Sequence, residues 1–458
     1  MAAPPPSSRN SVVPEQPDEP AHFALFGIPV RIGLGFWLMT FVFGFRSDRP
    51  FAAGLRAALA WTAIVLFSIL LHEMGHALAA RRFGARPSIK LHAFGGLTFT
   101  GIHTSRVRQV VISLAGPLMG FAFGALVFFV SRRFSIGANQ KWLIDQLLWV
   151  NIGWGIINLV PVVPLDGGHV LAAVLGPRNV FATWAISGAA AAAIALLGFK
   201  LHSPFMMVLF GFAAIHAIGN ARTAWAGIAD RRAGLEDQLQ KARNALDRGD
   251  LDDAWLLADD VVRRARTQPV RNGGWTAIAW VFVGRGDGLR ARQALTKVDP
   301  PFAIDPYTIA AVEDAAGDPS RARTVLEEAR KQGYRTPEAS KLLIDLSARD
   351  GRLERSIDLA LDDADILNPD DVRAVQRAAL ETGSARGAAR LAARLFELHG
   401  RPDDALAEAR SLIVAGDIES ALAAIVHALQ VGADRIAIRG DAGFASLAGD
   451  ERFEKILT

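Results

Sequence analysis

The stretch AALAWTAIVLFSILLHEMGH, residues 57–76, joins a membrane-type apolar run to a metal-binding motif. Its first fifteen positions contain no charged residue, and it ends in the pattern His-Glu-x-x-His. On a helix, His72 and His76 lie one turn apart on the same face, so both imidazoles can reach one metal ion. Glu73 lies beside them, where a carboxylate can activate a metal-bound water. Ionisable side chains in so apolar a segment indicate a functional site.

A third ligand decides between two interpretations of this motif. Without one, the histidines are an interfacial pair at the end of a membrane helix; with one, they form a catalytic metal site, which takes three protein ligands. Asp166 is the candidate, because it closes an uncharged segment, two prolines break the helix before it, and Gly167-Gly168 would let the backbone turn after it. Such a broken helix is tolerated at membrane depth where it lines a cavity, although a surface turn gives the same pattern. Beside the histidines, we favour a ligand.

The composition predicts a membrane region followed by a soluble one. Of the 458 residues, 51% are hydrophobic, and these are concentrated in the first half of the chain. The net charge of +4 is small, and basic residues do not alternate with aromatic ones on a compact face, so no nucleic-acid partner is expected. Cysteine is absent, which excludes disulfides and thiolate ligands, so a metal ion would need His, Asp or Glu.

Six apolar segments are predicted before residue 220, most of them near the length that crosses a hydrocarbon core of roughly 30 Å. The first is short, so it is either a tilted span or a re-entrant piece. The loop between the second and the third contains six basic residues and no acidic one, which predicts a cytoplasmic loop and, by counting, cytoplasmic N- and C-termini. The segments are residues 32–45, 53–83, 109–130, 147–165, 181–199 and 204–218.

Two shorter features belong to the same half. Residues 89–100 alternate around Gly95-Gly96, which predicts a short β-hairpin near the membrane surface. Residues 1–21 contain six prolines among Ser, Glu and Asp, which predicts a disordered tail.

The second half of the chain contains a degenerate repeat with a period near 34 residues. In each copy a Gly is followed five residues later by Ala or Ser, at Gly249/Ala254, Gly286/Ala291, Gly317/Ala322, Gly351/Ser356, Gly383/Ala388 and Gly416/Ala421. The period and the small residues indicate paired helices, with Gly in the turn and the small residue packed between them. The pattern resembles the tetratricopeptide repeat, and residues 441–453 would then form a terminal cap.

Four motifs of the first half follow one another in a fixed order. They are His72-Glu73-x-x-His76, Phe94-Gly95-Gly96, Ser113-Leu114-Ala115-Gly116-Pro117 and Asn158-x-x-Pro161-x-x-Pro164-Leu165-Asp166-Gly167-Gly168. In order and spacing they resemble the site-2 protease family of intramembrane zinc metalloproteases, over about residues 24–220.

The resemblance implies a set of roles for these residues. His72, His76 and Asp166 would bind Zn²⁺, and Glu73 would be the general base. Asn158 would help to stabilise the oxyanion, and Gly95 and Gly96 would border the substrate strand.

The predicted fold is mainly α: a polytopic membrane helix bundle of about six spans with a small β-hairpin or sheet near the active site, followed by an α-solenoid of tetratricopeptide-like repeats. The expected parts are a disordered Pro-rich tail, a membrane-embedded zinc metalloprotease domain, a linker helix and a repeat domain with its C-terminal cap. Their bounds are residues 1–21, 22–225, 226–240 and 241–458.

We therefore expect a multi-pass integral protein of a bacterial cell membrane, in contact with lipid, that cleaves transmembrane segments of membrane proteins in regulated intramembrane proteolysis. A concave helical array usually binds a protein or peptide, so a partner of that kind is expected for the repeat domain. The alternative hypothesis is a membrane-anchored repeat scaffold whose metal site is catalytically silent.

Overall fold

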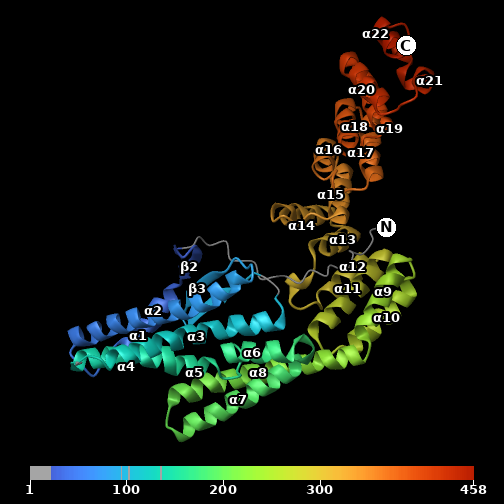
Figure 1. Cartoon of the computed structure of the whole chain (residues 1–458). Helices are drawn as coiled ribbons and strands as arrows, with labels where there is room; N and C mark the ends of the chain where they lie inside the picture. The colour runs from blue at the N-terminus through green and yellow to red at the C-terminus, as the bar shows by residue number, and fades with distance from the viewer. Residues whose placement is uncertain (1–21, 94, 102–103, 135–136) are drawn as a thin grey trace. The chain divides into compact units, whose positions relative to one another are not determined.

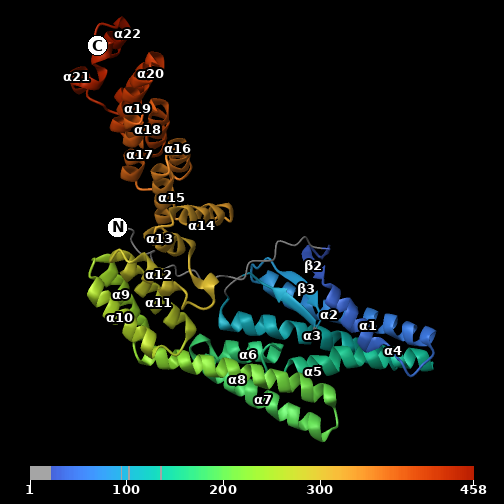
Figure 2. The ribbon, with the colours of Figure 1, turned by 180° about the vertical axis from the view of Figure 1, so that it is seen from behind.

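The computed structural model describes residues 22–93, 95–101, 104–134 and 137–458, and the described chain forms two compact units that meet in sequence between Ile228 and Ala229. The first unit is the membrane-type half, and the second is built of helix pairs (Figures 1 and 2). The predicted disordered tail and Phe94 lie outside the described residues.

Among the described residues, four helices are long and apolar enough to cross a membrane. They contain the second, third, fifth and sixth predicted segments, and most of the residues in their apolar windows face outward from the protein, as expected of helices that meet lipid. Their bounds are α2 (Phe51–Arg82), α3 (Arg106–Ser131), α7 (Val180–Lys200, preceded by the 3-10 turn Pro177–Asn179) and α8 (Pro204–Arg232).

The fourth predicted segment has different bounds in the structure. A continuous helical run begins with α4 (Ala138–Leu148), passes through the π-helical turn η1 (Trp149–Gly153) and ends with α5 (Trp154–Asn158). The helical run starts earlier than the predicted residue 147, and its first turns contain the charged residues Lys141 and Asp145. It also ends earlier than predicted, at Asn158, before Pro161 and Pro164. The first predicted segment is α1 (Leu34–Gly44), whose eleven residues are too few to cross a bilayer as a helix.

A four-stranded sheet packs against α2. Its strands are β1 (Phe23–Leu25), β2 (Ile28–Ile32), β3 (Ser88–His92) and β4 (Gly95–Phe99), in the order β1-β2-β3-β4. The predicted hairpin is the antiparallel pair β3–β4. Strands β1 and β2 were not predicted; they join through Phe26-Gly27, both with positive φ, which is the geometry of a tight two-residue hairpin turn.

The segment after α5 turns sharply into α6 (Asp166–Leu175). We expected Gly167-Gly168 to let the backbone turn, but both residues lie inside the first turn of α6. Their absent side chains serve close packing instead: a Cβ on Gly167 would lie 2.1 Å from the carbonyl oxygen of Leu159, and one on Gly168 would lie 2.4 Å from the backbone nitrogen of Val163. The two glycines therefore let the preceding segment, residues 159–163, pack directly against the first turn of α6.

The second unit consists of six consecutive helix pairs, and every predicted repeat glycine ends the first helix of a pair with positive φ. The small residue five positions later is buried in each copy. The pairs are α9 (Leu235–Asp247) with α10 (Leu251–Arg264), α11 (Gln268–Gly284) with α12 (Gly288–Leu295), α13 (Pro306–Ala315) with α14 (Pro319–Lys331), α15 (Pro337–Arg349) with α16 (Leu353–Asp362), α17 (Pro369–Glu381) with α18 (Ala385–His399), and α19 (Pro402–Val414) with α20 (Ile418–Gln430).

The ends of this unit refine the expected bounds. The predicted linker helix, residues 226–240, is divided between the end of α8 and the start of α9, and Leu235 and Leu239 of α9 belong to the buried core of the first pairs. After α20 come α21 (Arg435–Gly440), the 3-10 helix η4 (Ala442–Leu447) and α22 (Glu451–Ile456). Phe444 and Phe453 pack into the last core cluster, as a terminal cap requires.

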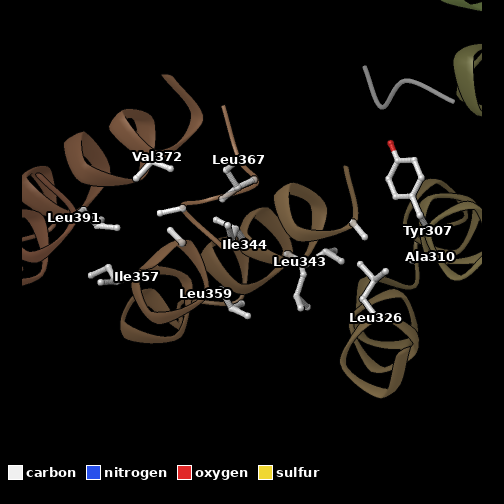
Figure 3. Close-up of a cluster of buried hydrophobic side chains, with 14 of the residues drawn as sticks. Tyr307, Ala310, Leu326, Leu343, Ile344, Ile357, Leu359, Leu367, Val372 and Leu391 are labelled. Carbon is white, nitrogen blue, oxygen red and sulfur yellow. The ribbon is translucent and has the colours of Figure 1, made fainter. Parts of the chain in front are cut away.

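In the middle of the unit, buried apolar side chains of successive pairs, from α11 to α18, form one cluster (Figure 3), while the first and the last pairs have clusters of their own. At one edge of this core, Asp363 is fully buried and its carboxylate binds two guanidinium groups, those of Arg330 and Arg335. Burial alone would raise the pKa of Asp363, but hydrogen bonds from Arg330, Ser340 and Arg335 outweigh it and hold that pKa below the ordinary range.

Replacing Asp363 by Ala should therefore destabilise the repeat unit by about 3–5 kcal/mol, because two arginines lose their buried partner. Urea unfolding of residues 229–458 measures the difference. Because the pKa of Asp363 is lower in the folded than in the unfolded state, its contribution to stability is fully present above pH ~4. The difference in stability between wild type and Asp363→Ala should therefore be largest there and should shrink as the pH falls below that value. The control is Asp365→Ala, whose half-exposed carboxylate also faces Arg335 and should cost at most about 1 kcal/mol. Equal effects of the two variants would contradict the assignment.

Candidate active site

The side chains of His72, His76 and Asp166 converge, although Asp166 is 94 residues from His72 in the sequence. The Nε2 atom of His72 lies 3.1 Å from Oδ2 of Asp166 and 3.1 Å from Nε2 of His76, and Nε2 of His76 lies 3.3 Å from Oδ1 of Asp166. Two atoms each about 2.0–2.1 Å from one tetrahedral ion lie about 3.3 Å apart. The three side chains therefore already have the mutual spacing of ligands to a single metal ion.

The second nitrogen of His76 is fixed by the backbone. Its Nδ1 lies 2.7 Å from the carbonyl oxygen of Ile112 in α3, and because a carbonyl only accepts, Nδ1 must carry the proton and donate it. Nε2 faces His72 and Asp166, and in the neutral ring it carries the lone pair that can bind a metal ion. A hydrogen bond of this kind, which fixes the tautomer and the ring orientation, is typical of metal-binding histidines.

Helix α3 approaches the two imidazoles closely, and glycine makes this possible. A Cβ on Gly116 would lie 2.2 Å from Nε2 of His76 and 2.8 Å from Nε2 of His72. On the facing helix, a Cβ on Gly75 would lie 2.4 Å from the carbonyl oxygen of Ala115. Both glycines therefore leave room where α2 and α3 cross at the site.

The carboxylate of Glu73 lies beside the two histidines and against strand β4. Thr98 of β4 donates a hydrogen bond of 2.6 Å from its hydroxyl to Oε2 of Glu73. A Cβ on Gly96 of the same strand would lie 2.5 Å from Oε1. The strand thus holds Glu73, which is 6% exposed, in one place next to the ligand cluster. One ring nitrogen each of His72 and His76 and one carboxylate oxygen of Glu73 lie within 4.8 Å of one another.

The structure gives the positions of two further predicted site residues, Asn158 and Gly95, but, within the part of the chain it describes, no contact that tests their predicted roles. Asn158 is the half-buried last residue of α5, eight positions before Asp166. Gly95 begins β4 opposite His92 with φ +140°, a conformation that side chains rarely adopt. The oxyanion role of Asn158 and the substrate-strand role of Gly95 and Gly96 stay predictions.

Sequence reasoning missed three groups that position the site: the hydroxyl of Thr98, the carbonyl of Ile112 and the bare Cα of Gly116. Gly116 lies inside a quoted motif, so a signal was present, although its role was not assigned. The hydroxyl of Thr98 and the carbonyl of Ile112 act through tertiary contacts, which no local pattern reveals.

Comparisons with known proteins agree with both halves of the prediction. Residues 307–372 match the family model of the tetratricopeptide repeat. The chain is 31% identical over 160 residues to a zinc metalloprotease of Methanocaldococcus jannaschii, which covers 34% of this chain and 45% of that protein. It is 27% identical over 110 residues to stage IV sporulation protein FB of Bacillus subtilis, covering 23% of this chain and 37% of that protein.

The solved structure of the site-2 protease from Methanocaldococcus jannaschii also matches, with 25% identity and a TM-score of 0.34, over 44% of this chain and 94% of that chain. The chain spans less than half the length of the curated relatives above. The membrane half is thus similar in sequence to zinc metalloproteases and to a solved site-2 protease, and the second half matches the tetratricopeptide repeat. The resemblance drawn from the motifs is confirmed.

Replacing Gly116 by Ala should weaken metal binding by about 10- to 100-fold, because the new methyl group would displace both imidazoles. Metal content after dialysis against a graded chelator measures the change in detergent-solubilised protein. The matched control is Gly211→Ala in α8, where, within the described chain, an added Cβ would meet nothing within 4 Å. Retention of the ion by Gly116→Ala at the wild-type level would show that this close approach is not required.

Proposed function

We propose that the chain is an intramembrane zinc endopeptidase that cleaves transmembrane segments of membrane proteins. The observation that carries the proposal is the convergence of His72, His76 and Asp166 at ligand spacing, beside a carboxylate fixed by β4. Two neutral imidazoles and a carboxylate are a donor set that zinc prefers for catalysis, with a fourth position left for water.

Zinc, when bound, lowers the pKa of a water molecule and polarises the scissile carbonyl. Glu73 takes the proton of the attacking water and returns it to the leaving amide nitrogen. Thr98 already donates to Oε2, and we propose that the other carboxylate oxygen, Oε1, carries the proton. The Thr98 hydrogen bond also keeps the carboxylate from rotating away while it changes charge.

The substrate must be extended to be cut, because a membrane helix hides its amide groups in its own hydrogen bonds. Among the described strands, β4 lies at the edge of the sheet and pairs only with β3. We propose that an unwound substrate segment adds to this edge, beside Gly95 and Gly96, and so reaches Glu73. Asn158 would donate to the oxyanion that forms during the attack.

The basic loop after α2 supports an orientation in which the active site opens toward the cytoplasm and both termini are cytoplasmic. Water then reaches the site from that side of the bilayer. The repeat domain would lie in the same compartment, where it recruits the substrate or a regulatory protein or peptide. The tetratricopeptide match and the repeated helix pairs support this role.

Exchange of Glu73 for Gln tests the enzyme. The variant should keep its zinc and lose cleavage of a co-expressed membrane substrate by at least about 10³-fold, because the amide keeps the shape of the side chain but cannot accept the proton. Zinc content and the amount of cleaved product, measured in the same membrane preparation, give both readouts. Identical product patterns in wild type and variant would favour the silent scaffold.

Deletion of residues 233–458, after the end of α8, tests the repeat domain. The shortened protein should bind zinc as before but should lose discrimination between substrates, seen as a changed ratio of cleavage rates for two membrane proteins. Point variant Glu73→Gln in the shortened chain is the control for background proteolysis. Unchanged rate ratios would exclude recruitment by the repeats.

A further inference from the structure

Asn151 and Ser68 form a buried polar pair one helical turn from the ligand histidines. Both residues are 3% exposed. The side-chain nitrogen of Asn151 donates to the hydroxyl of Ser68, at 2.9 Å, and to the carbonyl oxygen of Leu147, also at 2.9 Å. Ser68 precedes His72 by four residues on α2, so Ser68, His72 and His76 line one side of that helix.

Asn151 lies in the middle of the π-helical turn η1, in the helical run that leads to Asn158 and then to Asp166. A π-turn inserts one extra residue into a helix and frequently occurs at functional sites. Here it places an amide against the helix that carries the other two ligands. The hydrogen bond from Asn151 to Ser68 therefore ties α2, which carries His72 and His76, to the helical run that precedes Asp166 in the chain.

Three glycines of α3 pack against the two histidines and against the π-turn. Gly116 lies against the imidazoles, a Cβ on Gly120 would lie 3.2 Å from the carbonyl oxygen of Asn151, and one on Gly124 would lie 2.6 Å from Cγ1 of Ile152. The same helix thus supports the ligand cluster and the π-turn. A shift of the π-turn against α2 would have to displace α3 from the ligands as well.

An apolar side chain would fill this position at lower cost, because a buried amide needs partners for all of its polar atoms. Among the described residues, Oδ1 of Asn151 has no hydrogen-bond partner, so the cost is only partly offset. We propose that Asn151 and Ser68 are positioning residues for the metal site: their hydrogen bond sets the spacing between the helix of His72 and His76 and the segment of Asp166. The inference rests on the proposed zinc site.

The test compares metal binding in Asn151→Leu, Ser68→Ala and the double variant with wild type, in detergent-solubilised full-length protein. Each single variant should raise the zinc dissociation constant by about 10- to 100-fold, the usual effect of losing a group that orients metal ligands. The double variant should be no weaker than the worse single one, because both changes remove the same bond. The d–d absorption bands of the cobalt-substituted protein should shift in each variant, which reports changed ligand geometry.

Asn220→Leu is the matched control. Asn220 lies in α8, and its side-chain nitrogen donates to a carbonyl four residues earlier, as that of Asn151 does, but its hydrogen bonds among the described residues, to the carbonyl and the ring of His216, stay within α8. It should leave zinc affinity and the cobalt spectrum unchanged. The exchanged pair Ser68→Asn with Asn151→Ser keeps one donor and one acceptor and should recover affinity, which also covers the case in which Asn151→Leu folds poorly.

Three results separate the possibilities. If wild type binds no zinc, the proposed function itself fails. If wild type binds zinc and the three variants bind it equally, with an unchanged cobalt spectrum, the positioning role is overturned. Full zinc affinity with lost cleavage in Asn151→Leu would also overturn it, because Asn151 would then act on the substrate.

Discussion

The membrane half of this protein depends on one constraint: polar side chains in an apolar helix must find their partners inside the protein. Helix α2 buries Glu73 and His76, and each finds its partner on a different element. Asp166 at the start of α6 meets the imidazoles, the carbonyl of Ile112 in α3 fixes one ring, and Thr98 of β4 holds the carboxylate. The contacts made by the polar residues of α2 therefore constrain where α3, α6 and β4 lie around it.

Meeting that need requires backbone to come very near the polar atoms, and this determines where glycine occurs. The donor atoms of short side chains can reach a common point only if the neighbouring chains approach within contact distance. At Gly96 and Gly116 any Cβ would overlap the carboxylate of Glu73 or the imidazoles. A larger residue at either position would separate the groups that the site brings together, so site geometry and helix packing are one problem.

Much of this could be predicted from the sequence, because the informative signals were local. The His72-Glu73-x-x-His76 spacing places two candidate ligands on one helix face whatever surrounds it, and alternation around Gly95-Gly96 predicted the β3–β4 hairpin. The missed parts are those that depend on partners distant in the chain. Strands β1 and β2 were missed because three and five residues are too few to show a clear alternation of apolar and polar side chains. The ends of the fourth apolar run were misplaced because two charges hid its true start.

Glycine is required in this protein for two different physical reasons: a positive φ and the close approach of other atoms. Gly317 closes α13 with φ +84° and, among the described residues, has open space where a Cβ would be, so it is required by backbone conformation. Gly116 has no such φ, but its Cα faces two imidazole nitrogens, so it is required by proximity. A conformational requirement recurs with the repeat and can be read from its period of about 34 residues. A proximity requirement follows no such period, because each one depends on a particular contact between neighbouring segments, and only the three-dimensional structure reveals which atoms it accommodates.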